Sequence, residues 1–316
     1  MKRRIFCSMA LASTAAGRAL AQAQARVPSP EHTIGMSFPA ATHGWMGAII
    51  KNAADEANAR RLKYVMTTAD DAAQQAKDVE ALIARKVSAV VMLPISTREM
   101  GDITQKLQAA RIPLILVDRE LDSTLYAALV KGDNVGIGTN AARYIGGELK
   151  GQGSVIEIVG VPASVTDQRA KGFRDELTRL YPSIRILDST TGSFQREKSR
   201  TAMQDMLDAH RRIDAVFTHD DEMALGVVDA ITQSRRKDIR IVTGAGGNKE
   251  VYRMIGQGAP LMRATFVYSP LMAKDAVRVA SELLEGKPPR SKNITIPASA
   301  VHAGNIARFY DPAANY

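Results

Sequence analysis

The sequence has 316 residues, of which 45% are hydrophobic and 24% are charged, a composition typical of a globular protein with room for two domains of ordinary size. No run of about 20 apolar residues occurs, which argues against a membrane-spanning helix. The formal net charge is +9, but the basic runs are short and typical of solvated helix ends, so the charge does not predict nucleic-acid binding.

The first 25 residues differ in character from the rest. Residues 1–4 are basic, residues 5–20 are mostly apolar or small, and A-x-A-like cleavage patterns follow at residues 19–23. This order predicts a secretory signal peptide over residues 1–25, in preference to a disordered amino terminus. Its four basic residues leave a formal net charge of +5 when they are subtracted from +9. The only cysteine, Cys7, also lies here, so we expect no disulfide or thiolate in the mature protein.

From Thr33 onward, strand-like and helix-like patterns alternate. The first set predicts strands over residues 33–38, 62–66, 88–93, 112–117 and 126–130, and helices over residues 44–60, 71–85 and 98–110. The second set predicts helices over residues 134–149, 167–180 and 195–209, strands over residues 154–159, 184–187, 213–217 and 239–243, and a helix after residues 220–222. A helix over residues 248–255, a strand after residue 262, a helix over residues 272–284 and a strand over residues 293–296 complete the chain. Repeated strand–helix–strand units form parallel sheets covered by helices on both faces, so we predict an α/β protein with two similar doubly wound lobes.

Polar and aromatic side chains follow the predicted strands at their carboxyl ends, where ligands bind in open α/β sheets. These residues are His43, Trp45, Asp118, Arg119, Gln168, Arg169, Phe194 and Asp220. Arginine offers a rigid fork of donors, carboxylates accept from hydroxyl groups, and aromatic rings suit the C–H face of a sugar. Together they predict a cleft for a small polyhydroxylated ligand.

Three consecutive carboxylates, Asp220, Asp221 and Glu222, lie between a buried strand and the following helix. A helix N-terminus uses one or two acidic residues, as an N-cap and against the helix dipole. Three exceed what capping needs. We expect Asp220 to face a ligand and Asp221 to be the cap.

Structural roles remain open for several of these residues. Trp45 could pack in the core, Asp118 and Arg119 could form a surface ion pair of little energetic value, and Arg169 could be a solvated helix charge. Phe194 could fill a gap. We interpret His219, which directly precedes the three carboxylates, as a loop histidine without a role.

Motifs of common enzyme classes do not occur. The sequence has no H-E-x-x-H zinc motif, no G-x-S-x-G elbow and no Walker loop. Residues 244–247, Gly-Ala-Gly-Gly, match the dinucleotide-binding pattern weakly because they come late in the chain. We interpret them as a tight turn that brings the backbone close to something in the cleft, and we expect no catalytic residue, cofactor or metal.

Four motifs carry a family resemblance. They are Leu116-Val117-Asp118-Arg119, Gly132-Asp133-Asn134, Arg169-Ala170-Lys171-Gly172-Phe173, and Asp220-Asp221-Glu222-Met223-Ala224-Leu225-Gly226. From about Thr33 to near Ile296, the chain resembles the sugar-binding proteins of bacterial ABC importers, of the ribose-binding type within the type I periplasmic binding family. The resemblance implies two lobes joined by a hinge with three crossings, near residues 132, 265 and 291. The expected N-terminal lobe is residues 33–132 plus 266–291, and the expected C-terminal lobe is residues 133–265 plus 292–310.

The resemblance also implies roles for single residues. Asp118 and Arg119 would hydrogen-bond sugar hydroxyls, Arg169 would do so from the other lobe, and Trp45 and Phe194 would stack on the ring. Asp220 stands where the family often has Asn, residues 244–247 lack a carboxylate that the family commonly has there, and His43 and Leu93 stand where Asn is usual. These departures argue against ribose and favour another pentose, a hexose or an open-chain polyol, with His43 and either Tyr268 or Asn248 as new contacts. The full set of expected ligand-binding residues is His43, Trp45, Met46, Asp118, Arg119, Arg169, Phe194, Asp220, Gly246 and Tyr268.

The function that the resemblance implies is that of a periplasmic solute-binding protein. It would capture a monosaccharide or polyol between its lobes and deliver it to the membrane permease subunits of an ABC importer, as a monomer, without cofactor, metal or nucleic acid. Two other classes remain open: a sugar-sensing module for a chemoreceptor or two-component kinase, and a secreted sugar-modifying enzyme.

Overall fold

The structure is a computed structural model that describes residues 32–312 and Tyr316. The predicted signal peptide, with Cys7, lies outside the described residues. Within them, no helix has both the length and the apolar character that crossing a membrane requires.

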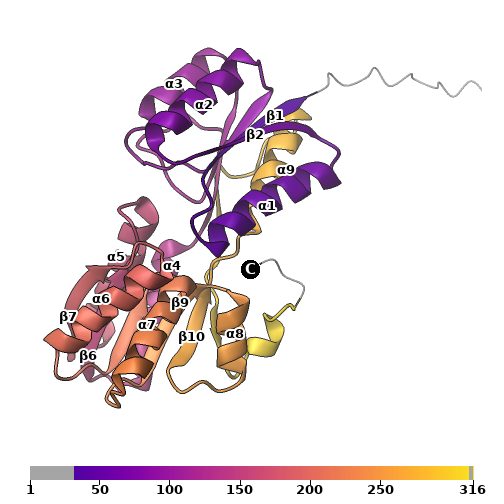
Figure 1. The fold of residues 1–316 in the computed structure, drawn as a ribbon. Coiled ribbons are helices and arrows are strands. Elements are labelled where there is room, and N and C mark those ends of the chain that lie inside the picture. The colour runs from indigo at the N-terminus through magenta and orange to yellow at the C-terminus, as the bar shows by residue number, and fades with distance from the viewer. Residues whose placement is uncertain (1–31, 313–315) are drawn as a thin grey trace, which may run out of the picture. The chain divides into compact units, whose positions relative to one another are not determined.

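Parallel strands form the sheet of the first lobe, in the order β11-β5-β4-β3-β1-β2. Figure 1 shows this lobe, with β1 and β2 among its helices. The strands are β1 (Thr33–Pro39), β2 (Lys63–Ala69), β3 (Ala89–Met92), β4 (Leu114–Val117), β5 (Ala128–Gly132) and β11 (Asn293–Ile296). The helices are α1 (Gly44–Ala59), α2 (Ala72–Ala84), α3 (Gly101–Ala109) and α9 (Met272–Leu284). β3 and β4 are buried at every residue, as apolar strands covered on both faces should be.

A second sheet has the order β12-β10-β9-β8-β6-β7, in which the short edge strand β12 is antiparallel and the other strands are parallel. Its strands are β6 (Gly153–Val159), β7 (Ile184–Thr191), β8 (Ala215–Thr218), β9 (Ile241–Gly246), β10 (Met262–Val267) and β12 (Ala300–His302). The accompanying helices are α4 (Asn134–Glu148), α5 (Ser164–Leu180), α6 (Arg196–Ala209), α7 (Asp221–Ser234), α8 (Lys249–Gly256) and the 3₁₀ helix η1 (Ile306–Arg308). Two α/β lobes built on parallel sheets confirm the predicted fold class.

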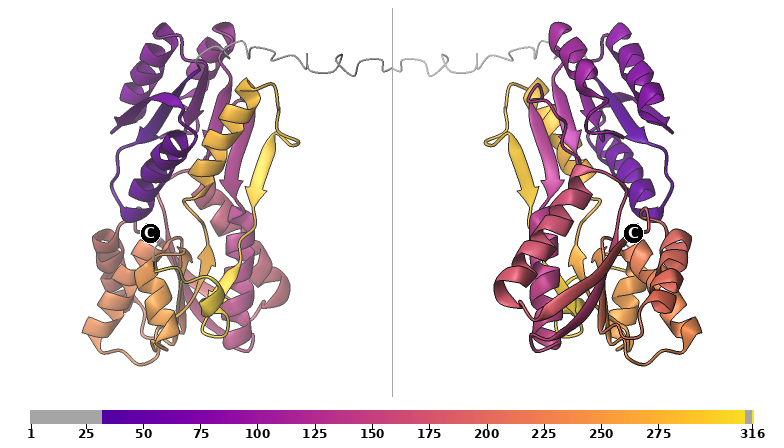
Figure 2. Two further views of the ribbon diagram at one scale, coloured as in Figure 1. Left: turned by 90° about the vertical axis from the view of Figure 1, so that its right-hand side faces the viewer. Right: turned by 90° about the vertical axis from the view of Figure 1, so that its left-hand side faces the viewer.

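The chain passes between the two sheets after β5, after β10 and after β11. Figure 2 shows β11, in yellow, beside β5 in the first lobe, where residues 293–296 pair in parallel with residues 129–132. The expected assignment of residues 292–310 to the C-terminal lobe is therefore wrong for β11. Its backbone pairs with the edge of the first sheet, so the third crossing follows Ile296 and not Ser291.

Small residues bring α4 and α5 close together at the start of both helices. A Cβ atom on Gly138 of α4 would collide with the backbone of α5 at Arg169 and Phe173, and a Cβ atom on Gly172 would collide with the carbonyl of Val135. This close crossing fixes the second turn of α5, which carries Arg169, against the start of α4. The glycines therefore position a predicted ligand-binding residue, although they lie outside the cavity.

Candidate ligand-binding site

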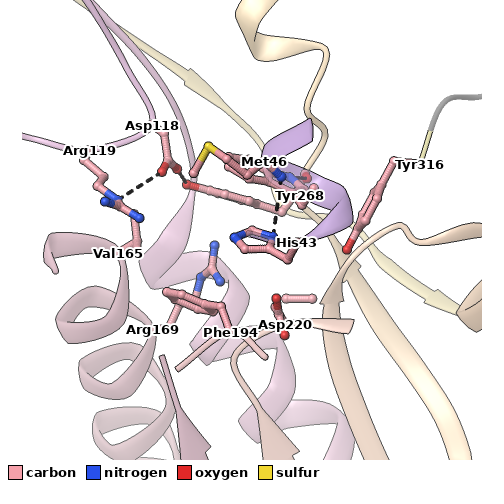
Figure 3. Close-up of a pocket in the computed structure, with 12 residues that line it drawn as sticks. His43, Met46, Asp118, Arg119, Val165, Arg169, Phe194, Asp220, Tyr268 and Tyr316 are labelled. Carbon is pink, nitrogen blue, oxygen red and sulfur yellow. Dashed lines mark hydrogen bonds and ion pairs between the residues drawn. The ribbon is translucent and has the colours of Figure 1, made fainter. Parts of the chain in front are cut away.

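A cavity lies between the two lobes, at the carboxyl ends of strands from both sheets (Figure 3). It contains about 390 Å³ of empty space, with the open solvent at its mouth included. The lining residues are His43, Trp45, Met46, Asp118, Arg119, Val165, Arg169, Phe194, Asp220, Ala245, Tyr268 and Tyr316.

Every expected ligand-binding residue except Gly246 lines this cavity. Gly246 borders a neighbouring groove instead, and β9 presents Ala245 to the cavity because successive residues of a strand point to opposite sides. Val165 and Tyr316 were not expected. Val165 follows β6 in the chain, so the strand-end argument could have found it, whereas Tyr316 lies beyond the last predicted strand and gives no sequence signal.

The start of α1 supplies one wall. His43 is its N-cap, and its Nδ1 accepts from the backbone N–H of Met46 at 3.4 Å. Burial, and then the charge of Arg119, lower the pKa of His43 to about 4. The imidazole is therefore neutral near pH 7, and the capping bond selects the tautomer whose Nε2 donates.

Asp118 and Arg119 follow β4. Asp118 has a left-handed backbone, with φ of 69°, and its carboxylate accepts from the hydroxyl of Tyr268 and lies 3.6 Å from Nε of Arg119. Nη1 of Arg119 donates to the carbonyls of Pro94 at 3.2 Å and Ile95 at 3.1 Å. Burial raises the pKa of Asp118, against the lowering effects of Arg119, Tyr268 and Arg169. The pair is buried, so it is not a surface ion pair.

Tyr268, in the crossing between β10 and α9, lies at the centre of the site. Its ring stacks on Trp45 with centroids 5.4 Å apart, and the guanidinium of Arg169 covers the ring at 4.2 Å. Its hydroxyl donates to Asp118 and accepts from the amide of Asn134 at 3.3 Å. Trp45 in turn donates from Nε1 to the carbonyl of Tyr268 at 2.8 Å. This one side chain therefore contacts groups from both lobes.

Arg169 is only 3% exposed, so it is not a solvated helix charge. Its Nε donates to Oδ1 of Asn134 at 2.9 Å and its Nη1 donates to the carbonyl of His219. These two bonds fix the plane of the guanidinium and use two of its five N–H groups. The remaining donors of the fork are available to a ligand.

The two aspartates at the start of α7 exchange their expected roles in part. Asp220 is the N-cap, because its Oδ1 accepts from Met223 N–H at 2.8 Å, and it also lines the cavity. Asp221 is fully buried and accepts from Oγ1 of Thr265 at 2.6 Å and from the backbone N–H groups of Gly247 at 2.7 Å and Asn248 at 2.8 Å. The expectation that Asp221 is the cap is therefore wrong, because its side chain turns toward the end of β9.

The carboxylate of Asp221 explains why residues 244, 246 and 247 are glycines. Residues 244–246 continue β9 and do not form a turn. A Cβ atom on Gly244 would collide with the carboxylate of Asp221, and Gly246 and Gly247 have φ of +154° and +105°. The glycines do bring the backbone close to another group, but that group is Asp221 and not a ligand.

The carboxyl groups next to the cavity titrate at unusually high pH. Burial raises the pKa of Asp220 to about 7, against the bond from Met223, and the charge of Asp221 raises it further. Burial likewise raises the pKa of Asp221 to about 6, against the bonds from Thr265, Asn248 and Gly247. Keeping two such groups beside a cleft is typical of a functional site.

Phe194 precedes α6 and has a left-handed φ of 58°. Its ring lies so close to Gly160 that a Cβ atom there would overlap it, and its centroid is 6.4 Å from that of His43. The side chain therefore faces His43 across the cavity.

His219 is not a loop histidine without a role. It is fully buried, and its Nε2 lies 3.2 Å from Oε1 of Glu157. Glu157 is also buried and accepts from Nη2 of Arg174 at 2.7 Å. The carbonyl of His219 accepts from Arg169, so this residue helps to hold the arginine of the site. Among residues 32–312, no group of three or more His, Cys, Asp or Glu side chains could hold a metal ion.

Two α/β lobes with a polar and aromatic cavity between the carboxyl ends of their strands define a two-lobed protein that binds a small molecule. The family model described as the periplasmic binding protein domain matches residues 34–288. The ribose import binding protein RbsB of Bacillus subtilis (strain 168) is 33% identical over 260 residues, which are 81% of this chain and 83% of that protein.

Solved structures agree with this assignment. The crystal structure of a galactofuranose binding protein superposes with a TM-score of 0.84 at 25% identity, over 90% of this chain and 100% of that one. The fructose binding periplasmic domain of a hybrid two-component system superposes with a TM-score of 0.79 at 26% identity, over 88% and 92% of the two chains. The second match shows that the fold also serves in sensing, but it does not favour sensing over import for this chain.

The chain belongs to the periplasmic binding protein family. The predicted family resemblance is thereby confirmed. Its relatives are binding proteins and not enzymes, which agrees with the expectation of a protein without catalytic activity.

Proposed function

We propose that this protein captures a monosaccharide or an open-chain polyol between its lobes and delivers it to the permease subunits of an ABC importer. One observation carries this proposal: hydrogen-bonding groups from both lobes converge on one cavity with aromatic walls. Asp118 and Arg119 come from the first lobe, and Arg169 and Asp220 from the second. A ligand with hydroxyl groups on several carbons can bond to both pairs at once.

Each side chain has chemistry suited to such a ligand. The fork of Arg169 and the Nε2–H of neutral His43 donate to hydroxyl oxygens, and the carboxylate of Asp220 accepts from hydroxyl hydrogens. The rings of Phe194 and Trp45 offer apolar surface to carbon-bound hydrogens. Neutral hydroxyl groups satisfy both the donors and the acceptors.

The relatives support the same ligand class, since proteins named for ribose and galactofuranose are similar to this chain over most of its length. Their ligands differ from one another, and several contacts here differ from the ribose-binding pattern. A pentose other than ribose, a hexose or a polyol is therefore the proposed ligand.

Capture would occur by closure of the lobes around the ligand. Direct bonds already join the lobes beside the cavity: the backbone N–H of Glu120 donates to Ser164 at 3.2 Å, and Gln168 donates to the Glu120 carboxylate at 2.9 Å. A ligand that bonds to both lobes adds to these contacts and favours the closed arrangement. We further propose that the closed form acts as a monomer in the periplasm and is recognised there by the permease.

The test is a binding screen of the mature protein. Thermal shift against pentoses, hexoses and alditols identifies the compounds that raise the melting temperature, because a ligand specific for the native state stabilises it, and calorimetry then measures their affinity. Chromatography of the recovered compound checks that it is released unchanged. Saturation by an unrelated metabolite, with no heat from any saccharide or alditol, would refute the proposal.

A further inference from the structure

Tyr316 occupies one end of the cavity although it lies far from every predicted motif. Its side chain is 9% exposed. It is placed between the lobes: a Cβ atom on Gly44, at the start of α1, would lie 3.3 Å from the Tyr316 ring, and one on Gly246 of β9 would lie 3.2 Å from its hydroxyl. In Figure 3 the ring stands at the edge of the cavity, with its hydroxyl directed toward the side where Asp220 lies.

The hydroxyl of Tyr316 lacks a hydrogen-bond acceptor among the described residues. The hydroxyl is buried, and the amide of Asn248 faces the phenolic oxygen as a donor. Burial raises the pKa of Tyr316 well above its ordinary value, the carboxyl groups of Asp221, Asp220 and Glu222 raise it further, and the amide of Asn248 only partly opposes them. The phenol therefore keeps its proton, and a buried hydroxyl without an acceptor costs free energy. A ligand oxygen in the cavity would supply that acceptor.

Asp220, at the same end of the cavity, has an oxygen that can accept a hydrogen bond. One carboxylate oxygen accepts from Met223 N–H at 2.8 Å, and the other makes no hydrogen bond among residues 32–312. A phenolic donor and a free carboxylate acceptor thus meet at the same end of the cavity. Two hydroxyl groups on adjacent carbons match this arrangement, because one oxygen can accept from the phenol while the neighbouring hydroxyl donates to the carboxylate.

We propose that Tyr316 is a ligand-contacting residue that sets specificity, and that it binds a vicinal diol of the ligand together with Asp220. This inference rests on the proposed function, since it requires a polyhydroxylated ligand in the cavity. It goes beyond that function by naming the feature of the ligand that the second lobe selects. It also assigns a role to a residue outside the region that the family model covers.

The test compares Tyr316→Phe with Tyr310→Phe, a matched control from the same part of the chain that is 38% exposed and outside the cavity. Calorimetry of the mature protein uses ribose, arabinose and xylitol as probes, with 2-deoxyribose as the analogue that lacks one hydroxyl. Tyr316→Phe is expected to weaken the best probe about tenfold, as the loss of one buried hydrogen bond should, while Tyr310→Phe leaves its affinity unchanged. The melting temperature of the empty protein should change little in Tyr316→Phe, because the phenolic proton has no acceptor among the described residues.

A second comparison, between two sugars, distinguishes contact of Tyr316 with the ligand from a packing role. If the phenol and Asp220 bind adjacent hydroxyls, Tyr316→Phe should bring the ratio of the affinities for ribose and 2-deoxyribose closer to one. Equal affinities in Tyr316→Phe and Tyr310→Phe overturn the inference and leave the proposed function standing. Failure of the unmodified protein to bind any sugar or polyol overturns both, so the two failures are distinguishable.

Discussion

The substitution Asp220→Asn tests whether a buried carboxyl group at the cavity is kept at a cost to stability. Asp220 is 7% exposed, and it forms no ion pair with a basic side chain among the described residues. Asparagine has nearly the same shape and is as good an N-cap as aspartate. The bond from Met223 should therefore survive, and the variant removes the charge while it replaces the other carboxylate oxygen by an NH2 group.

The magnitude follows from the pKa of Asp220, which burial raises from an ordinary value near 3.8 to about 7. Each pKa unit corresponds to about 1.4 kcal/mol, so the charged form destabilises the empty native state by up to about 4 kcal/mol. Below about pH 4 the group is protonated in both the native and the unfolded protein, and the penalty is absent. Between about pH 4 and pH 7 the native state holds the proton that the unfolded state releases, so stability falls as pH rises and the full penalty applies above about pH 7.

Urea denaturation of the empty mature protein at pH 4, 6 and 8 measures this effect. Asp220→Asn should match the unmodified protein at pH 4 and exceed its free energy of unfolding by about 2–4 kcal/mol at pH 8. Asp221 also titrates in this range and is present in both proteins, so the comparison at each pH measures the contribution of Asp220 together with its repulsion from Asp221. A stability difference that does not change with pH, or a less stable variant at pH 8, would show that the carboxyl group is not held as described.

Three further substitutions test the positioning of the site. Arg169→Ala should weaken binding of the best sugar by roughly 2–3 kcal/mol in calorimetry, since ligand hydroxyls lose charged donors; unchanged affinity would remove this arginine from the site. Asp221→Ala leaves three donors without their acceptor and should lower the free energy of unfolding by about 2–4 kcal/mol in urea, whereas normal stability would contradict its structural role. Gly138→Ala should destabilise the protein, because the new Cβ atom would collide with the backbone of α5. Its control is Gly147→Ala on the same helix, which has open space around it and should stabilise the protein by about 0.5–1 kcal/mol. Equal melting temperatures for the two variants would refute the close helix crossing.

The order and type of the elements could be predicted because each depends on local pattern. Apolar runs predict buried strands, the 3.6-residue period predicts helices, and their alternation predicts parallel sheets. The pairing of β11 with β5 depends instead on the meeting of segments more than 150 residues apart. The sequence of β11 is compatible with either sheet edge, so local pattern alone puts the third crossing too early, near residue 291.

The residues of the site could be predicted to the extent that strand ends determine them. Arg169 and Asp220 follow strands of the second sheet and lie close together because the strands of a parallel sheet end at one edge. Asp118 follows a strand of the first sheet, whose carboxyl edge faces the same cavity. The division of work between Asp220 and Asp221 could not be predicted, because both can cap a helix. It is decided by a rotamer choice that depends on Thr265 of β10 and on the backbone of Gly247, which follows β9.

The contacts of Tyr268 show how far the chemistry of the site is already expressed without a ligand. Asp118 accepts from a hydroxyl, Trp45 stacks on a six-membered ring and Arg169 covers its other face. For Asp118 and Trp45 these are the roles that the sequence predicted toward a sugar, whereas Arg169 was expected to donate to sugar hydroxyls and here covers a ring. These contacts hold the side chains of Asp118, Trp45 and Arg169 in place, and we expect a bound ligand to share Asp118 and Arg169 with Tyr268 or to displace its hydroxyl.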